Sequence, residues 1–390
     1  MTATTGIYLD HAATTPCRPE VIAALVPYLG EHFGNASGVY ALSRASRTAL
    51  DAARAGVAAV LHCHPGEIIF TGGGTESDNL ALRGVATAAH RAGRGNHIVI
   101  SAIEHHAILH AADELEAQGF AVTRVGVDRT GRVTPEAVAA ALRPDTCLVS
   151  IMLANNEVGT INPIAAIAAL AHARGIPVHT DAVQAPGALG LDVDALGVDL
   201  LSLSGHKFYG PKGVGVLYVR QGIAFVPQQQ GGGQEGGRRA GTENIAGIVG
   251  LATALTLAES ERPEVSVRLA ALRERLAIGL TAAIPDLIIN GHPVEHLPGT
   301  LHLNLPGVDG ESLLYGLDAR GIACSAASAC SAGSTAASHV LTAIGIDTIT
   351  SGASLRLTLG RTTTLDEIDH VIAVLPGFVA ALRGTPALAG

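Results

Sequence analysis

The sequence contains no tryptophan, few other aromatic residues and few charged ones. Aromatic residues make up 3% of the 390 residues and charged residues 15%, whereas apolar residues make up 48%. Disordered chains show the reverse balance, so we expect most of this chain to fold around a large core. Because rings are scarce, that core must be built from Ala, Val, Leu and Ile. The length favours two or three packed units over one small domain.

Long apolar runs are absent as well. The most apolar stretches, such as 164–171 and 371–375, are far shorter than the roughly 20 residues that a membrane-spanning helix needs. Residues 1–6 show neither the basic nor the apolar region of a secretory signal, so we predict a cytoplasmic protein. Lys and Arg are dispersed and the formal net charge is −9, which argues against direct binding of nucleic acid. Small substrates or protein partners are favoured instead.

The sequence contains few cysteines, and their number is odd. The five cysteines are widely spread, at 17, 63, 147, 324 and 330, and in a reducing compartment they are expected as thiols. At least one of them is a candidate for chemistry. The run His62-Cys63-His64 hints at a metal, but adjacent ligands rarely close one tetrahedral site. We interpret it as a turn before Pro65 and predict no metal site.

Strand and helix patterns alternate through the first two thirds of the chain, and 47 glycines punctuate them. Short β-branched runs separated by Ala-rich helical stretches are typical of βαβ units around a mostly parallel sheet. The predicted strands are 67–71, 97–101, 121–125, 146–152, 177–180, 198–202 and 214–219, with helices at 76–91, 106–118, 135–142 and 164–174. This pattern predicts a doubly wound α/β domain.

A second pattern follows a Gly-rich stretch at 231–241 and a helical region near 244–283. It contains predicted strands at 300–305, 322–324 and 354–359 and predicted helices near 310–320, 335–344 and 365–383. We predict a smaller α+β domain there.

Polar residues directly follow three of the predicted strands. In an open parallel sheet, ligands bind beyond the carboxyl ends of the strands. The turn 71–76 is rich in glycine and opens a helix, whose backbone N–H groups and dipole suit a phosphate. Asp181 and Gln184 follow a second strand, and Ser204-Gly205-His206-Lys207 follows a third.

These residues favour pyridoxal phosphate over a nucleotide. The Walker pattern is absent, and the formal Gly-x-Gly-x-x-Gly match at 231–236 follows a glutamine run, not a strand. Pyridoxal phosphate needs a lysine for a Schiff base, an acid paired with its pyridine nitrogen, and phosphate donors. His105, after the strand at 97–101, is available to cover the face of the ring.

Several ordered motifs then resemble one family. The sequence resembles the cysteine desulfurases of the NifS/IscS type, which are fold-type I pyridoxal-phosphate enzymes related to class V aminotransferases. The resemblance runs from about residue 7 to about residue 375. The motifs that carry it are Tyr8-Leu9-Asp10-His11-Ala12-Ala13-Thr14-Thr15, Gly74-Thr75-Glu76-Ser77-Asp78-Asn79, Asn155-Asn156-Glu157-Val158-Gly159, Ser204-Gly205-His206-Lys207 and Arg239-Ala240-Gly241-Thr242.

The resemblance implies a role for each matching residue. Lys207 looks like the Schiff-base lysine, Asp181 the partner of the pyridinium, and Gln184 a donor to the phenolic oxygen. His105 looks like the stacking ring and a candidate proton shuttle. The remaining implied ligands are Gly74, Thr75, Ser204 and His206 for the phosphate, Thr242 for the phosphate of the other subunit of a homodimer, Asn156 beside cofactor and substrate, and Arg356 for the substrate carboxylate.

Cys330 is the implied nucleophile, in a loop of Ala, Ser and Gly that ends at Ser338-His339-Val340-Leu341. This context resembles the IscS/NifS subgroup more than the SufS subgroup. Two departures from the family pattern bear on the loop: Ala327 stands where glycine is usual, and Thr335-Ala336-Ala337 replaces Leu-Glu-Pro. For Cys324 and the other three cysteines, a small buried apolar side chain is the better interpretation.

The family implies removal of sulfur from L-cysteine, giving alanine and a persulfide on Cys330. The persulfide would serve a sulfur-acceptor protein, either an iron–sulfur scaffold or a tRNA-thiolation carrier. The expected division is an N-terminal segment 1–20 packing with the small domain, a large cofactor-binding domain 21–260 and a small domain 261–390. Alternatives are a selenocysteine lyase, a lyase for another thiol, and a non-catalytic subunit; the presence of both Lys207 and Cys330 argues against the last.

Overall fold

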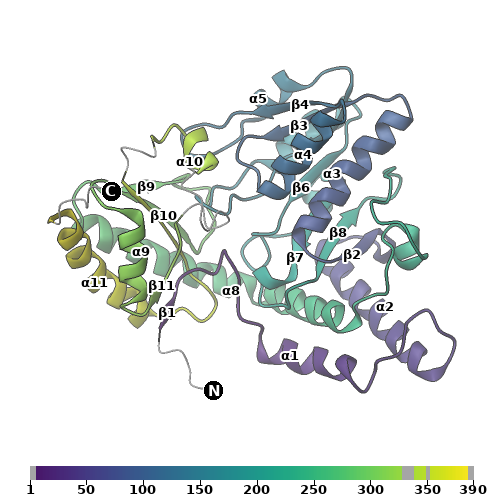
Figure 1. The fold of residues 1–390 in the computed structure, drawn as a ribbon, viewed down its shortest axis with the longest axis horizontal. Helices are drawn as coiled ribbons and strands as arrows, with labels where there is room; N and C mark the ends of the chain where they lie inside the picture. Colours follow the sequence, from purple (N-terminus) through teal and green to yellow (C-terminus); the bar gives the residue numbers. More distant parts are fainter. Residues whose placement is uncertain (1–5, 327–337, 348–351, 385–390) are drawn as a thin grey trace.

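A long helix, α8 (Ile245–Ala283), runs beneath both halves of the molecule (Figure 1). The computed structural model describes residues 6–326, 338–347 and 352–384. The first part of α8 packs into the core of the large sheet and the second part into the core of the small sheet. Pro263 lies inside the helix between these two parts. The domain boundary predicted at 260/261 therefore falls within a continuous helix, and the division into domains stays a prediction.

The large sheet confirms the predicted α/β fold. Its seven strands have the order β2-β8-β7-β6-β5-β3-β4, and β8 alone runs antiparallel to its neighbours. The strands are β2 (Ile68–Thr71), β3 (His97–Ser101), β4 (Ala121–Val125), β5 (Thr146–Ser150), β6 (Val178–Asp181), β7 (Leu200–Ser204) and β8 (Gly215–Val219). All seven predicted strands are present, and β7 begins two residues later than predicted.

Local hydrogen bonds explain the late start of β7. The short helix α7 (Val193–Leu196) ends at Gly197, which adopts the left-handed conformation. The backbone N–H of Val198 is bonded to Val193 O of that helix, at 3.2 Å. Val198 is thereby held as part of the helix end, and strand pairing starts at Leu200.

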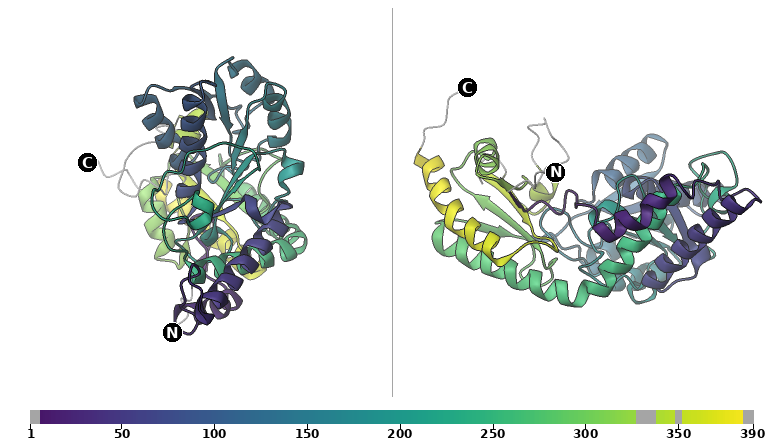
Figure 2. Two further views of the ribbon diagram at one scale, coloured as in Figure 1. Left: turned by 90° about the vertical axis from the view of Figure 1, so that its right-hand side faces the viewer. Right: turned by 90° about the horizontal axis from the view of Figure 1, so that it is seen from below.

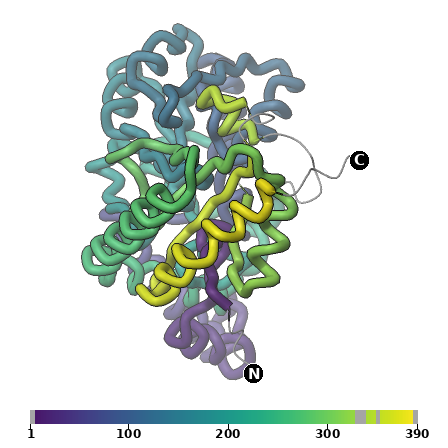
Figure 3. Tube along the Cα trace, turned by 90° about the vertical axis from the view of Figure 1, so that its left-hand side faces the viewer, coloured from purple at the N-terminus to yellow at the C-terminus, as the bar shows by residue number. Residues whose placement is uncertain are grey.

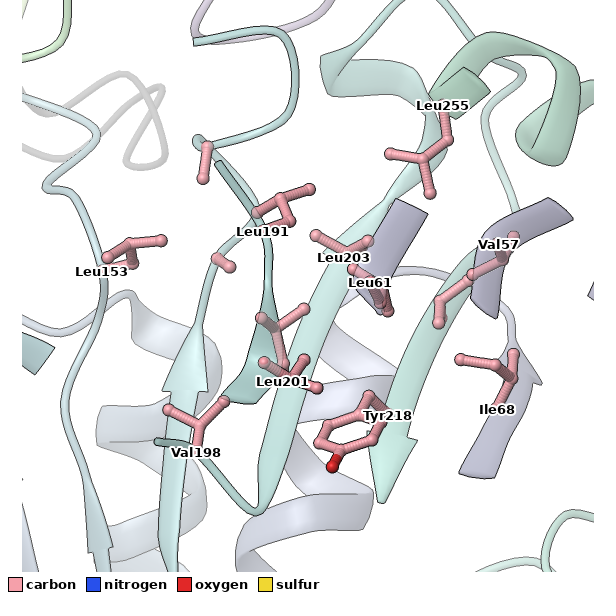
Figure 4. Close-up of a cluster of buried hydrophobic side chains, with 14 of the residues drawn as sticks. Val57, Leu61, Ile68, Leu153, Leu191, Val198, Leu201, Leu203, Tyr218 and Leu255 are labelled. Atoms are coloured by element: carbon pink, nitrogen blue, oxygen red, sulfur yellow. The ribbon is translucent and has the colours of Figure 1, made fainter. Parts of the chain in front are cut away.

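Helices cover both faces of the large sheet (Figure 1). The predicted helices are confirmed as α3 (Gly74–Arg91), α4 (His106–Ala117), α5 (Pro135–Ala141) and α6 (Ile164–His172). Three helices were not predicted: α1 (Pro19–Leu25), α2 (Ala41–Leu61) and the short α7. Aliphatic side chains of α2, β2, β7 and α8 meet in one cluster with Tyr218 (Figure 4). Short 3-10 turns complete this half: η1 (Val26–Leu29), η2 (Pro65–Glu67), η3 (Gly205–Lys207) and η4 (Gln234–Gly237).

The smaller half is an antiparallel sheet of order β12-β10-β9, flanked by helices. α8 and α11 lie side by side against it (Figures 2 and 3). Its elements are β9 (Ile288–Asn290), β10 (Thr300–Leu305), α9 (Gly310–Asp318), β11 (Ile322–Ala323), β12 (Ala353–Thr358) and α11 (Leu365–Gly384). The short helix α10 (His339–Ala343) follows β11 in sequence but packs against Ile103, Met152 and Val158 of the large half. The N-terminal strand β1 (Ile7–Tyr8) pairs with β11, so the start of the described chain joins this half. None of the described helices has the length and apolarity needed to cross a membrane.

Candidate active site

A cavity of about 610 Å³ opens at the N-terminus of α3. Gly73 precedes the helix with φ of 150°, which a side chain would strain, and no side chain among the described residues caps this helix end. Its first N–H groups can therefore serve an anion. The cavity is lined by Gly72, Gly73, Gly74, Thr75, Glu76, Asn79, Ser204, His206, Lys212 and Gly213. The predicted phosphate ligands Gly74, Thr75, Ser204 and His206 are thus brought together.

Lys207 ends the 3-10 turn that follows β7. Its Nζ donates hydrogen bonds to the carbonyl oxygens of Ala12 and Ala13, at 2.5 and 2.9 Å. The N-terminal segment 10–18 holds the lysine turn further, because Thr15 N–H donates to His206 O and Arg18 N–H donates to Tyr209 O. The amine is therefore fixed at the carboxyl edge of the sheet. Lys207 and Lys212 are the only two lysines in the whole sequence.

Asp181 is the last residue of β6, one strand away from Lys207. Burial raises the pKa of its carboxyl to about 6, while the N–H of Val183 and the charge of Lys207 act in the opposite direction. Gln184 follows in the same turn and donates from Nε2 to Ala12 O at 3.1 Å. Asp181, Gln184 and Lys207 therefore converge on one place, as the sequence predicted.

His105 is the N-cap residue of α4. Its Nδ1 accepts a hydrogen bond from the N–H of Ala107 at 3.1 Å. Burial lowers the pKa of the ring to about 4, and the nearby Lys207, His106 and His110 lower it further. The ring is therefore neutral at pH 7, with its proton on Nε2, because Nδ1 is an acceptor. A proton shuttle through this ring would require the Nδ1 cap to open first.

Arg356 lies in β12 and reaches, from the small half, the turn that follows β5. Its side chain is 3% exposed. Nη1 donates to Asn156 O at 2.9 Å and Nη2 to Asp10 Oδ1 at 2.8 Å. The turn at Asn156 is itself fixed, since Asn155 Oδ1 accepts from the N–H groups of Glu157 and Val158. The predicted substrate arginine and Asn156 are therefore in direct contact.

Two predicted residues are not placed at this site by the described chain. Cys330 lies outside the described residues, as do Ala327 and the stretch 335–337. Thr242 is exposed just before α8 and does not line the phosphate cavity of its own chain. Its role toward a partner subunit stays a prediction.

The other cysteines have raised thiol pKa values. Burial raises the pKa of Cys17, and it raises the pKa of Cys147 to about 11 and those of Cys63 and Cys324 to about 12. These thiols are therefore protonated at neutral pH and poor nucleophiles. At His62-Cys63-His64 the structure has a turn, in which His64 caps η2. No group of His, Cys, Asp or Glu within the described ranges could hold a metal ion.

Sequence reasoning gave no role to Glu104, which lies beside His105. Its side chain is fully buried, and Oε1 accepts from Ser101 Oγ at 2.5 Å and from Met152 N–H at 2.9 Å. Burial raises the pKa of Glu104 to about 8, and the charge of Asp181 adds to this. Asp78 is buried nearby with a raised pKa, caused by burial and then by Asp181. Of these acids, Asp181 has Lys207 as a compensating cation.

Replacing Glu104 with glutamine tests the charge of this buried carboxyl. An acid whose pKa is raised on folding costs stability as the pH rises from its unfolded to its folded pKa, here from 4.5 to about 8. Glutamine keeps an acceptor oxygen for Ser101 and Met152 but has no charge. Relative to the wild type, Glu104→Gln should gain on the order of 3 kcal/mol of unfolding free energy between pH 5 and pH 8. Urea unfolding of both proteins at pH 5 and at pH 8 measures this gain. If the difference in unfolding free energy between variant and wild type is the same at the two pH values, the prediction is wrong.

Comparison with known proteins extends over nearly the whole chain. The model of the family "Aminotransferase class-V" matches residues 7–371. The cysteine desulfurase IscS of Methanosarcina thermophila is 48% identical over 378 residues, which cover 97% of this chain and 93% of that protein. A solved NifS-like protein superposes with a TM-score of 0.91 at 35% identity, covering 97% of this chain and 100% of that one. SspA in complex with cysteine superposes with a TM-score of 0.79 at 35% identity, covering 90% and 98% of the two chains.

Proposed function

Because this chain belongs to the class V aminotransferase family, and within it to the pyridoxal-phosphate-dependent cysteine desulfurases, we propose that it removes sulfur from L-cysteine with the side chains gathered around Lys207. One observation carries the assignment. The Lys207 amine, the Asp181 carboxyl and the open N-terminus of α3 lie at the carboxyl ends of β7, β6 and β2. An amine, an acid and an anion cradle in that arrangement match what pyridoxal phosphate requires.

The residues present fit this cofactor. At the α3 cradle, a Cβ on Gly74 would lie only 2.9 Å from Val183 Cγ2, so α3 can lie this close to the turn after Asp181 because residue 74 has no side chain. Ser204 and His206 complete the phosphate site, and Lys207 would hold the aldehyde carbon. Asp181 would pair with the ring nitrogen, Gln184 would donate to the phenolic oxygen, and His105 would cover the ring face. When bound, the cofactor withdraws electrons from the Cα of the substrate.

In the proposed reaction, four side chains of this chain act on the substrate. Arg356 binds the carboxylate, and Asn156 lies beside it. Lys207 Nζ takes the proton from the substrate Cα. Cys330 Sγ, as a thiolate, attacks the substrate sulfur; the new S–S bond forms while the C–S bond breaks, and its electron pair stays with the carbon, which is protonated to alanine.

Incubation of the cofactor-loaded protein with L-cysteine and a thiol reductant tests this function. We expect alanine and sulfide in equal amounts, because each turnover transfers one sulfur and the reductant releases it. A lyase acting by β-elimination would instead yield pyruvate and ammonia. Pyruvate as the main carbon product would therefore overturn the desulfurase assignment.

A homodimer is part of the same proposal. Large apolar side chains are exposed along the segment from α1 to the start of α2, where a second copy could cover them. They are Ile22, Val26, Leu29, Phe33, Val39, Tyr40 and Leu42. Thr242, exposed on its own chain, would then reach the phosphate cavity of the partner. A monomeric mass in sedimentation equilibrium would reject this arrangement.

We also propose transfer of the persulfide sulfur to an acceptor protein, either an iron–sulfur scaffold or a tRNA-thiolation carrier, in the cytoplasm. The described cysteines 17, 63, 147 and 324 are all free thiols, which agrees with a reducing compartment. Incubation of the persulfidated protein with candidate carriers, followed by mass spectrometry of the carrier cysteine, distinguishes the two acceptors. If neither the iron–sulfur scaffold nor the tRNA-thiolation carrier takes up sulfur from the persulfidated protein, neither is the acceptor.

A further inference from the structure

The predicted substrate arginine is already bound by a carboxylate of its own chain. Asp10 lies just after β1, and its Oδ1 accepts from Arg356 Nη2 at 2.8 Å. The Asp10 side chain is 18% exposed, against 3% for Arg356. A substrate carboxylate that reaches this arginine must therefore share it with, or displace, a negative charge that is already in place.

The backbone of Asp10 is fixed on both sides. It forms a parallel bridge with Thr358 of β12, and its carbonyl accepts from Tyr8 Oη at 3.0 Å. Leu9 N–H donates to Ala323 O at 2.8 Å. Because both neighbouring strands hold this backbone, Asp10 is a built part of the arginine site. Two residues further along, the same segment supplies the carbonyls that hold Lys207 Nζ.

The guanidinium of Arg356 keeps unused donor capacity. Nη1 is occupied by Asn156 O, and Nη2 by Asp10. Nε is buried and has no hydrogen-bond partner among the described residues. A buried donor without a partner is costly, which favours a further acceptor at this arginine. One carboxylate beyond that of Asp10 satisfies this requirement.

Of the other titratable groups around the pair, all but Glu157 are uncharged at neutral pH. Burial lowers the pKa of His302 to about 3, and Arg356 lowers it further, so this imidazole is neutral. Burial, then Asp10, raise the pKa of Tyr8 and of Cys324, so both stay protonated. Burial raises the pKa of Glu157 to about 7, against the opposing effect of Arg356. Asp10 is the carboxylate in direct contact with the guanidinium.

We propose that Asp10 is a specificity-determining residue, which orients Arg356 and restricts the site to amino acids with a single negative charge. Arg356 and Asp10 together are neutral, so one substrate carboxylate brings the local charge to −1. A second carboxylate on the substrate would bring it to −2 beside a guanidinium that is only 3% exposed, where like charges repel strongly. This proposal rests on the proposed function, because it takes Arg356 as the residue that binds the substrate carboxylate.

The test compares Asp10→Asn with the wild type, using two amino acids that lack a transferable sulfur. L-alanine and L-aspartate are titrated into the cofactor-loaded enzyme, and the visible absorption of the cofactor gives each Kd. Asparagine keeps the shape and the acceptor oxygen of Asp10 but removes its charge. We expect the ratio of the Kd for L-aspartate to that for L-alanine to fall about tenfold in Asp10→Asn. An unchanged ratio, with both Kd values higher, would show a purely structural role and overturn the proposal.

Glu261→Gln is the matched control. Glu261 is also a carboxylate that ties the N-terminal segment to the small half, since it accepts from Arg18 at 2.9 Å and from Arg361 at 2.9 Å. It does not contact Arg356, so its replacement should leave the Kd ratio at the wild-type value. A ratio that falls equally in Glu261→Gln would also overturn the proposal.

A second measurement covers failure of Asp10→Asn to fold. In the wild type, L-aspartate should bind about tenfold more weakly than L-asparagine, which has the same shape without the second charge. Equal affinities would overturn the proposal. If the wild type makes no alanine from cysteine, the proposed function fails, whereas these Kd values still decide the role of Asp10.

Discussion

Lys207→Ala should abolish the visible absorption that cofactor-loaded wild type shows, and lower alanine formation from cysteine roughly 10³-fold or more. The expected loss is large because the proposed function gives this one amine two tasks, holding the cofactor aldehyde and moving the Cα proton. Its Nζ is held by the carbonyls of Ala12 and Ala13, within range of Asp181 and His105. Absorption spectra of the reconstituted variant measure the first loss, and alanine quantification measures the second.

Lys212→Ala is the matched control for this change. The chain has two lysines, and Lys212 lines the phosphate cavity without approaching Asp181 in the way Lys207 does. At saturating cofactor, Lys212→Ala should therefore keep the absorption band. Borohydride reduction of the wild type followed by peptide mass spectrometry should find the cofactor mass on the peptide that contains Lys207. A band that persists in Lys207→Ala would remove this lysine from its role.

Cys330→Ser should retain bound cofactor and still lower alanine formation roughly 10²-fold or more, because a serine hydroxyl cannot accept the substrate sulfur as a persulfide. Cys330→Ser should therefore lose only alanine formation, whereas Lys207→Ala should lose both alanine formation and the absorption band. Alkylation of the wild type after a single turnover, followed by mass spectrometry, should place one extra sulfur on Cys330. The serine variant should carry none.

Cys324→Ser is the control for that prediction. Cys324 is near Cys330 in sequence, but its thiol pKa is raised to about 12, by burial first and then by Asp10 and Asp318. A protonated thiol does not attack sulfur at neutral pH, so Cys324→Ser should work at the wild-type rate. If instead Cys324→Ser is inactive and Cys330→Ser is active, the nucleophile has been assigned to the wrong cysteine.

Sequence reasoning found the strands of the large sheet and the residues directly after them, because both leave local signals. A buried strand is a short β-branched run, and the candidate ligand residues Asp181 and Lys207 lie at or just after the end of such a run. The helix α2 was missed although Leu50, Val57 and Leu61 are buried on it. Its buried residues recur at helical spacing on one face, so the sequence did carry the signal of an amphipathic helix, and the sequence reasoning overlooked it.

Contacts over long sequence separations could not be predicted in this way. Asp10 and Arg356 are 346 positions apart, and their ion pair depends on β12 lying beside the N-terminal segment. Likewise, Glu104 follows β3 like a ligand residue, yet the packing around it buries the carboxyl fully. The signal that could have drawn attention to Asp10 is its position inside the motif Tyr8–Thr15, and for Glu104 it is the position directly before His105.

The helix α8 bears on how the protein unfolds. Ile248, Leu251 and Leu255 pack into one core, and Leu272, Leu276 and Leu280 of the same helix pack into the other. Loss of either core removes the tertiary contacts that stabilise half of this helix, and helical stability in proteins comes mostly from such contacts. The two halves are therefore coupled in their stability, and neither is a module that could be excised, exchanged or inherited alone with its core intact.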